Sequence, residues 1–303
     1  MVLGYFGGFF LVFIAGFFWI GIGIAVSKCS ARGWDYNIVQ GLTSLGASLV
    51  CVVILVEQSI VTGSSGFSGF GFLMSVLGGF ANFYNYVFTA KAMQKGPNGL
   101  VWGMMQAGMI GSFLMGVLFF GERPAWFQVL GLLLVLGGVL GMGLAKDRKN
   151  FVQGKSWVLL SLCAFMFCIV TQCCCTLPSY FQRLGENSAL SRTLGMYIGG
   201  VFGFVFTTLP GMIRERKFGG RGEWITAGIL VLLNTSASLF FFYRGLDLLV
   251  QSGCAGLGYP LAIGVCVIGF SFYSLLVLKE KFARKGMIGL CAVCLGIIII
   301  AIR

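Results

Sequence analysis

The sequence predicts an all-α polytopic membrane protein with ten transmembrane helices. Of its 303 residues 58% are hydrophobic and only 10% are charged, and the mean hydropathy is +0.94. About a quarter of the residues in a soluble domain are charged, so this chain has too few to cover a surface in water. Apolar runs of about 20 residues recur along the chain, and each is long enough to cross about 30 Å of hydrocarbon. These runs do not alternate apolar and polar residues, which argues against a transmembrane barrel.

Ten apolar spans follow one another with short connections, so we expect no soluble domain outside the bundle. The first begins near the N-terminus without a positively charged n-region and is longer than the apolar part of a signal peptide. We therefore expect it to be retained as a helix. The expected spans are 5–26, 36–56, 69–90, 98–120, 125–145, 156–177, 190–211, 224–244, 253–278 and 286–302.

The two halves of the chain resemble each other. The segment "KGPNGLVWG" (95–103) aligns with "SGCAGLGYP" (252–260), and Glu122 aligns with Glu280 near the end of the fourth and ninth spans. A glycine pair in the fifth span also aligns with a pair in the tenth: Gly131 and Gly138 with Gly289 and Gly296.

This alignment predicts two five-helix repeats, 1–150 and 151–303. Because five is an odd number, the second repeat must enter the membrane with inverted topology. Inverted repeats are typical of secondary transporters, in which the substrate site lies near the middle of the membrane between the repeats.

The basic residues predict the orientation of the chain. The net charge is +12, and the odd-numbered connections carry sixteen of the 21 Lys and Arg residues, whereas the even-numbered connections and the C-terminus carry five. The positive-inside rule then places the odd connections in the cytoplasm and both termini outside. These clusters suit anionic lipid headgroups, and we do not expect nucleic-acid binding. We expect a multi-pass protein of the inner (cytoplasmic) membrane.

The chain resembles the ten-helix drug/metabolite transporter superfamily, whose members carry an EamA-like repeat in each half. The resemblance rests on "FQVLGLLLVLGG" (127–138) and "MIGLCAVCLGII" (287–298), each a few residues after an acidic residue. Within the superfamily the chain is most similar to the L-rhamnose–proton symporter and glucose/ribose uptake group, through "SKCSARGWDYN" (27–37), "SLFFFYRG" (238–245) and "LVLKEKFARKG" (276–286). The resemblance implies a central cavity lined by the first, third, fourth, sixth, eighth and ninth spans.

Uncharged polar and aromatic residues lie inside these spans and are the candidate substrate-binding residues: Asn82, Tyr84, Asn85, Trp102, Gln106, Gln172, Asn234 and Tyr259. An amide inside hydrocarbon is costly unless it is hydrogen-bonded. Amides can bind the hydroxyls of a neutral polyol while aromatic rings pack on its C–H faces, but the same set would suit an amino acid or a nucleobase. Hydrogen bonds that hold helices together are an equally simple explanation.

The acidic residues give a weaker prediction. None of them lies at the centre of a span and the chain has no histidine, whereas proton coupling usually needs a buried ionisable group. Glu57 is the deepest candidate for a coupling residue. Arg244 and Asp247, three residues apart, are expected to form an ion pair at the membrane surface. Proton symport and facilitated diffusion both remain open.

The run Cys173–Cys175 does not predict a metal or redox site. Adjacent residues on a helix point about 100° apart, so three consecutive thiols cannot bind one metal ion. Free cysteine behaves as a small apolar residue, and we expect these residues to pack between helices. No metal and no cofactor is expected.

Together these observations predict a secondary transporter that works by alternating access and carries a small polar metabolite. A sugar or related polyol, with proton coupling open, is the first interpretation. Export or facilitated transport of amino acids, nucleobases or other metabolites is the alternative. A membrane scaffold or a membrane-embedded enzyme is the remaining class, but the spans supply no convergent catalytic groups, and we expect no enzymatic activity. The expected partners are the substrate and the lipid bilayer, and the oligomeric state is not predicted.

Overall fold

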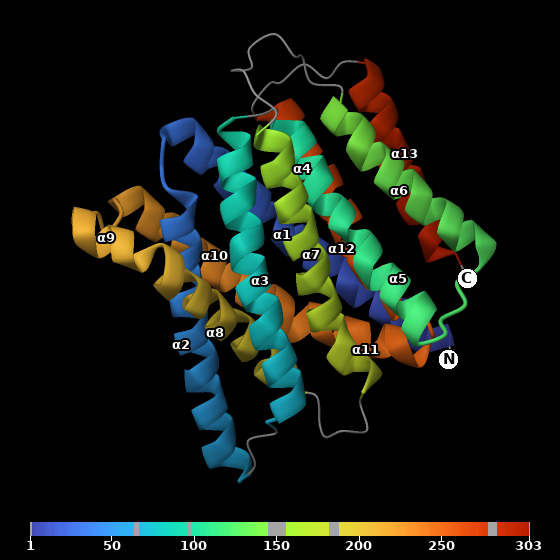
Figure 1. The fold of residues 1–303 in the computed structure, drawn as a ribbon. Helices are drawn as coiled ribbons and strands as arrows, with labels where there is room; N and C mark the ends of the chain where they lie inside the picture. Colours follow the sequence, from blue (N-terminus) through green and yellow to red (C-terminus); the bar gives the residue numbers. More distant parts are fainter. Residues whose placement is uncertain are drawn as a thin grey trace.

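A computed structural model describes residues 2–63, 67–95, 98–144, 156–181, 188–277 and 284–302. Each of the ten expected spans contains helix, and the described residues form no strand, which confirms the all-α fold class (Figure 1). The proposed repeat boundary at residues 150/151 and Glu280 lie outside the described residues. The helices are α1 (Val2–Arg32), α2 (Tyr36–Thr62), α3 (Gly69–Met93), α4 (Asn98–Gln106), η1 (Ala107–Met109), α5 (Ile110–Phe119), α6 (Trp126–Leu144), α7 (Ser156–Tyr180), α8 (Ala189–Thr207), α9 (Leu209–Glu215), α10 (Arg221–Ser236), η3 (Ala237–Phe242), α11 (Tyr243–Gln251), η4 (Ala255–Leu257), α12 (Gly258–Leu276) and α13 (Arg284–Ala301).

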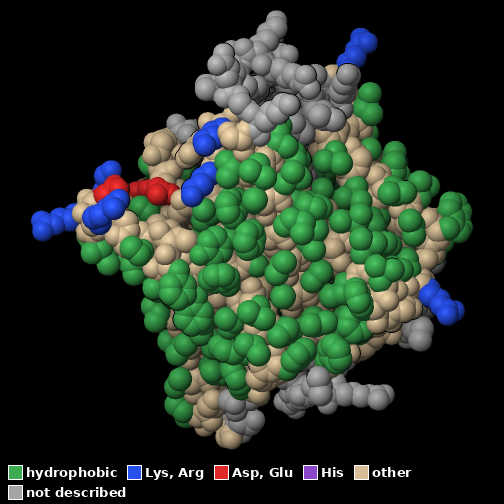
Figure 2. Space-filling model, viewed as in Figure 1, with side chains coloured by type: hydrophobic (Ala, Val, Ile, Leu, Met, Phe, Trp, Pro, Cys, Tyr) green, Lys and Arg blue, Asp and Glu red, His purple; other side chains and the backbone are tan. Residues whose placement is uncertain are grey.

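The outer surface has the character of a membrane protein. In Figure 2 hydrophobic side chains cover most of the visible face, and the basic side chains lie at its margins. By length and composition, 6 helical stretches of the described chain can cross a membrane, and three shorter apolar helices accompany them. The number of ten crossings stays a prediction.

Polar residues at the ends of the apolar runs determine where several helices begin and end. The side chain of Asp35 accepts a hydrogen bond from the backbone of Asn37 and caps α2, and Ser68 and Ser188 cap α3 and α8 in the same way. Gly63 ends α2 in the left-handed conformation, at φ 66°, which glycine adopts without steric cost.

Helices α6 and α13 pack directly against each other through glycine. A Cβ atom added at Gly131 would lie 2.8 Å from the carbonyl oxygen of Gly296, and one added at Gly138 would lie 2.5 Å from that of Gly289. The residue numbers of the contacts rise along α6 and fall along α13, so the two helices are antiparallel. Small residues at such a contact let two membrane helices approach closely.

The remaining helices form matching sets of contacts in the two halves. Helix α3 packs on α7 and α8, while α10 packs on α2 and α11 packs on α1. Helix α1 also packs on α12, and α4 and α5 pack on α7. The helices that the sequence alignment equates therefore have equivalent neighbours.

Irregular backbone occurs at places that the sequence predicted only in part. Proline usually ends or kinks a helix, but α7 continues through Pro178 to Tyr180. In the ninth span the 3₁₀ turn η4 precedes Gly258, and Pro260 lies in the first turn of α12, where proline is tolerated. Two further irregular segments were not predicted: the 3₁₀ turn η1 in the fourth span and the π-helical segment η3 in the eighth.

The close contact between α6 and α13 predicts different effects for two neighbouring glycines. Gly138→Ala should lower the free energy of unfolding by about 1–3 kcal/mol, because its methyl group would overlap the backbone of Gly289. The control Gly137→Ala should be neutral or slightly stabilising, because a Cβ there meets nothing within 4 Å and alanine is favoured over glycine in a helix. Thermal unfolding of the purified variants measures both, and equal melting temperatures would contradict the contact.

Candidate functional site

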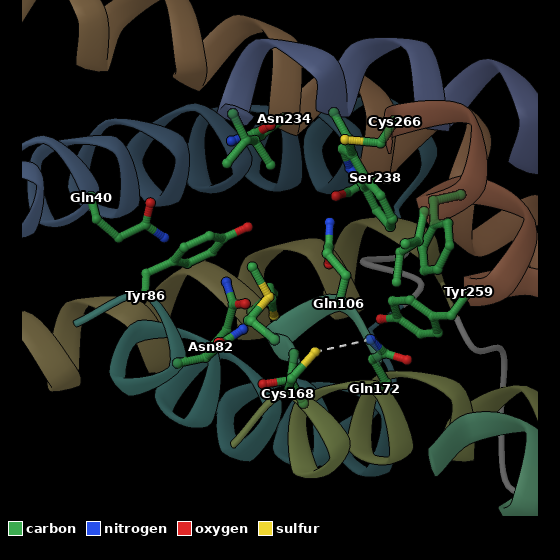
Figure 3. Close-up of a pocket in the computed structure, with 18 of the residues that line it drawn as sticks. Gln40, Asn82, Tyr86, Gln106, Cys168, Gln172, Asn234, Ser238, Tyr259 and Cys266 are labelled. Atoms are coloured by element: carbon green, nitrogen blue, oxygen red, sulfur yellow. Dashed lines mark hydrogen bonds between the residues drawn. The ribbon is translucent and has the colours of Figure 1, made fainter. Parts of the chain in front are cut away.

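A cavity of about 110 Å³ lies at the centre of the bundle, between helices of both halves. By its volume it can hold several water-sized groups. Its side chains come from α1, α2, α3, α4, α7, α8, α10, η3, α11 and α12, and Figure 3 shows that the labelled amides and hydroxyls converge from facing helices. The lining residues are Trp19, Ile22, Gln40, Asn82, Asn85, Tyr86, Trp102, Met105, Gln106, Cys168, Thr171, Gln172, Met196, Tyr197, Asn234, Ser238, Phe242, Tyr243, Tyr259, Ile263 and Cys266.

The structure brings seven of the eight candidate residues to this cavity: Asn82, Asn85, Trp102, Gln106, Gln172, Asn234 and Tyr259. Tyr84 is the exception and is not among the lining residues. Its ring stacks on Phe167 with a centroid distance of 5.6 Å. The reason is helical geometry: Asn82 and Asn85 are three residues apart and share a face of α3, whereas Tyr84 points away from that face.

Two more spans contribute to the cavity than the resemblance implied. Gln40 comes from α2, and Met196 and Tyr197 come from α8. Sequence reasoning missed Gln40, although it is a polar residue inside an apolar span and gives the same signal as Gln172. The paired helices α6 and α13 contribute no lining residue among those described.

Three polar atoms of the cavity wall have no hydrogen-bond partner within the described part of the chain: Trp102 Nε1, Gln172 Oε1 and Asn234 Oδ1. The other end of the Gln172 amide donates to Cys168 Sγ at 3.1 Å (Figure 3). An unsatisfied buried polar group costs about 1–3 kcal/mol. One buried donor and two buried acceptors of residues that line the cavity are therefore unsatisfied within the described part of the chain.

Aromatic rings form one wall of the cavity. Phe242 packs against Trp19 and Tyr259, with centroid distances of 4.7 Å and 4.8 Å, and the rings of Trp19 and Tyr259 stack on each other at 6.1 Å. Trp102 and Tyr259, which the alignment of the two halves places at equivalent positions, both line the cavity. An aromatic wall beside amides can bind a molecule with both C–H and hydroxyl surfaces.

Comparison with known proteins agrees with this architecture. Residues 6–144 match the model of the EamA-like transporter family. The first half of the chain is therefore similar to an EamA-like transporter domain, which favours a membrane protein that transports small molecules. The second half lies outside the matched range.

A solved structure, described as "Crystal structure of protein", is similar over the whole chain. It has a TM-score of 0.67 and 14% sequence identity, and the match covers 96% of this chain and 95% of that one. At this identity the likeness concerns the fold alone. A comparison with curated protein sequences gives no match.

The charged residues lie outside the cavity wall: none of its described lining residues is Asp, Glu, Lys or Arg. Glu57 is exposed on the outer face of α2, in line with the exposed side chains of Val53 and Ile60. The structure thus separates the coupling candidate from the cavity that it was expected to serve.

The prediction of an ion pair between Arg244 and Asp247 is wrong. Arg244 is exposed, whereas Asp247 accepts a hydrogen bond from the fully buried Arg192 at 2.8 Å. Sequence spacing suggested the local pair on one helix, but the fold brings an arginine from α8 beside α11.

Glu122 has a structural position at the end of the bundle. It accepts hydrogen bonds from the backbone N–H groups of Ala255 and Gly256 and from the Tyr180 hydroxyl, at 2.6, 3.0 and 2.9 Å. Burial raises the pKa of its carboxyl, and these hydrogen bonds oppose the shift. Glu122 thereby joins the α5–α6 connection to the start of the ninth span.

The three consecutive cysteines point in different directions. Cys175 is fully buried, while Cys173 and Cys174 are partly exposed. Cys168, one turn earlier than the run, lines the cavity together with Cys266 from α12. These two thiols can therefore report on access to the cavity.

Two glutamines provide a test of the cavity wall. Gln172 and Gln128 are each 3% exposed, but Gln128 is satisfied by Ala125, Tyr5 and the backbone of Ile302. Gln128→Met should lower the free energy of unfolding by about 1–3 kcal/mol through the lost hydrogen bonds. Gln172→Met should leave it unchanged or raise it slightly, because it removes an unsatisfied oxygen. Thermal unfolding in detergent compares them, and equal destabilisation would contradict a polar cavity at Gln172.

Proposed function

We propose that the protein is a secondary transporter that carries a small, uncharged polar metabolite by alternating access, with the central cavity as its substrate site. The observation that carries this proposal is a cavity between the two halves whose wall holds amides, hydroxyls and aromatic rings without a charged residue among its described members. A substrate with a full charge would lack a counter-charge there, and an unpaired charge is costly away from water.

The arrangement of helices supports an inverted duplication, with repeats 1–150 and 151–303. The fifth and tenth spans of the sequence, α6 and α13, pack antiparallel through equivalent glycines. The second and seventh, α2 and α8, also run antiparallel, since Gly41 lies beside Phe204 and Gly200 beside Ser44. Two copies of one unit inserted in opposite directions produce such pairs, and they allow one site to open toward either side of the membrane.

A sugar or related polyol is the substrate class that we propose first. The wall offers unpaired acceptors at Gln172 and Asn234, an unpaired donor at Trp102, and the ring of Phe242 for C–H contacts. Amino acids and nucleobases are the second candidates, because amides also bind their polar edges. We further propose the inner membrane, with both termini outside the cytoplasm, from the distribution of basic residues.

Uptake into proteoliposomes tests this proposal. Labelled neutral sugars and polyols should enter with saturable kinetics, and amino acids and nucleobases form the comparison set. Asn82→Ala and Asn234→Ala should each weaken the apparent affinity about tenfold or more, because a lost hydrogen bond in a site built for it leaves a buried partner unpaired. Loss of saturable flux for every class in the wild type, or lower melting temperature with unchanged affinity in the variants, would contradict it.

The exposed position of Glu57 gives a separate prediction. Glu57→Gln should transport at the wild-type rate with unchanged dependence on a proton gradient, because this side chain lies on the outer face of α2. The measurement is substrate flux with and without an imposed pH gradient. Loss of the gradient dependence in this variant alone would instead identify Glu57 as the proton carrier.

A further inference from the structure

A buried ion pair lies next to a residue of the cavity wall. Arg192 has a side chain that is 0% exposed, and its Nη1 donates to Asp247 Oδ1 at 2.8 Å. Its Nη2 donates to the carbonyl oxygen of Cys175 at 2.9 Å and to Ser179 Oγ at 2.8 Å, and Ser179 donates in turn to Asp247 at 2.6 Å. The guanidinium lies over the ring of Tyr243, 4.2 Å from its centroid.

These residues come from three helices that meet at one end of the bundle. Cys175 and Ser179 lie in the last turns of α7, and Arg192 lies in the first turn of α8. Asp247 is in α11 and is 25% exposed, while Tyr243, one turn earlier on the same helix, lines the cavity. Tyr243 therefore lies in the cavity wall, and the pair of Arg192 and Asp247 is in contact with it or one turn away on the same helix; we call this end of the bundle the α7–α8 end.

Stability of the fold alone does not account for an ion pair at this position. Two charges lose much of their hydration on burial, and a well-packed apolar pair of similar volume often stabilises a protein as well or better. Ionisable residues inside membrane segments are costly and commonly mark functional positions. The ion pair and its hydrogen bonds form only while α7, α8 and α11 are packed together. Such a contact suits a helix that moves between a closed and an open position.

Helix α11 has a point at which it can change direction. The π-helical segment η3 ends at Phe242, directly before the first residue of α11, Tyr243. Segments of this kind interrupt the regular hydrogen bonds of a helix and often occur at functional sites. Ser238 and Phe242 of this segment line the cavity, so a bend here would move α11 and its Asp247 relative to the cavity wall.

The opposite end of the bundle is joined by a different kind of contact. There Glu223 of α10 accepts hydrogen bonds from the backbone N–H groups of Asp35 and Gly220. The buried ion pair thus distinguishes the two ends of the cavity.

From this geometry we propose that Arg192 and Asp247 form the latch of a gate that closes the cavity at the α7–α8 end, with α11 as the moving element and η3 as its hinge. Tyr243 connects the latch to the cavity, because the guanidinium of Arg192 packs over its ring and its side chain forms part of the cavity wall. The inference rests on the proposed function only in requiring that the cavity opens to solution, and its test needs no substrate.

Access to the cavity thiols measures the gate directly. In nanodisc-reconstituted protein, a charged methanethiosulfonate reagent is applied and modification of each cysteine is followed by peptide mass spectrometry. Cys168 and Cys266 report the cavity, and Cys29, which is 1% exposed in a separate packed cluster at the opposite end, reports unfolding. The variants are Asp247→Asn and the double variant Arg192→Met/Asp247→Leu, which removes both charges of the pair. The control is Glu215→Gln, which removes the exposed ion pair with Lys217.

The latch predicts that both variants raise the modification rate of Cys168 and Cys266 about tenfold or more, a size typical of conformational coupling. Cys29 should react at the wild-type rate in both variants, and all three cysteines should react at the wild-type rate in Glu215→Gln. Unchanged rates at the cavity thiols in the double variant would overturn the proposal. A parallel rise at Cys29 in the double variant would also overturn it, because the pair would then hold the fold rather than a gate. If the double variant transports a substrate at the wild-type rate and its cavity thiols react at the wild-type rate, the latch is rejected and the transport function is retained.

Discussion

Hydrocarbon cannot hydrogen-bond, so a polar group within a membrane protein is costly unless it finds a partner inside the protein. This constraint explains the organisation of the bundle. Gln40, Asn85, Gln106 and Gln172 are all buried, and all line the central cavity. The outer surface is mainly aliphatic and aromatic (Figure 2). Polar groups that remain without a partner at the centre mark the place where a polar molecule gains most by binding.

Helices away from the cavity and helices around it have different structures. The pair α6 and α13 joins backbone to backbone through Gly131 and Gly296 and contributes nothing to the described cavity wall. The fourth and eighth spans, by contrast, contain the irregular segments η1 and η3 next to lining residues. The closely packed pair α6 and α13 can act as a fixed support, while the helices interrupted by η1 and η3 can rearrange around the cavity.

The sequence predicted those features that depend on local pattern. Apolar length predicted where helices form, and isolated amides in apolar runs identified five of the six amide side chains that line the cavity among the described residues. Tyr84 was wrongly predicted to line the cavity. It is close in sequence to Asn82 and Asn85 but lies on a different face of α3. The contact between Arg192 and Asp247 could not be predicted, since the two residues are 55 positions apart and join only through the packing of α8 on α11. The segments η1 and η3 contain no proline, so the sequence did not predict that the backbone is irregular there.

The match of residues 6–144 to a transporter family and the polar cavity between the halves lead to one central claim: a neutral polar substrate binds between Gln172, Asn234 and Trp102. The most direct test is a cryo-EM structure of the protein with a substrate identified by uptake. The account predicts ligand density in the central cavity, with hydrogen bonds to these three side chains. Ligand density elsewhere, or a lipid chain occupying the cavity in the presence of saturating substrate, would contradict it.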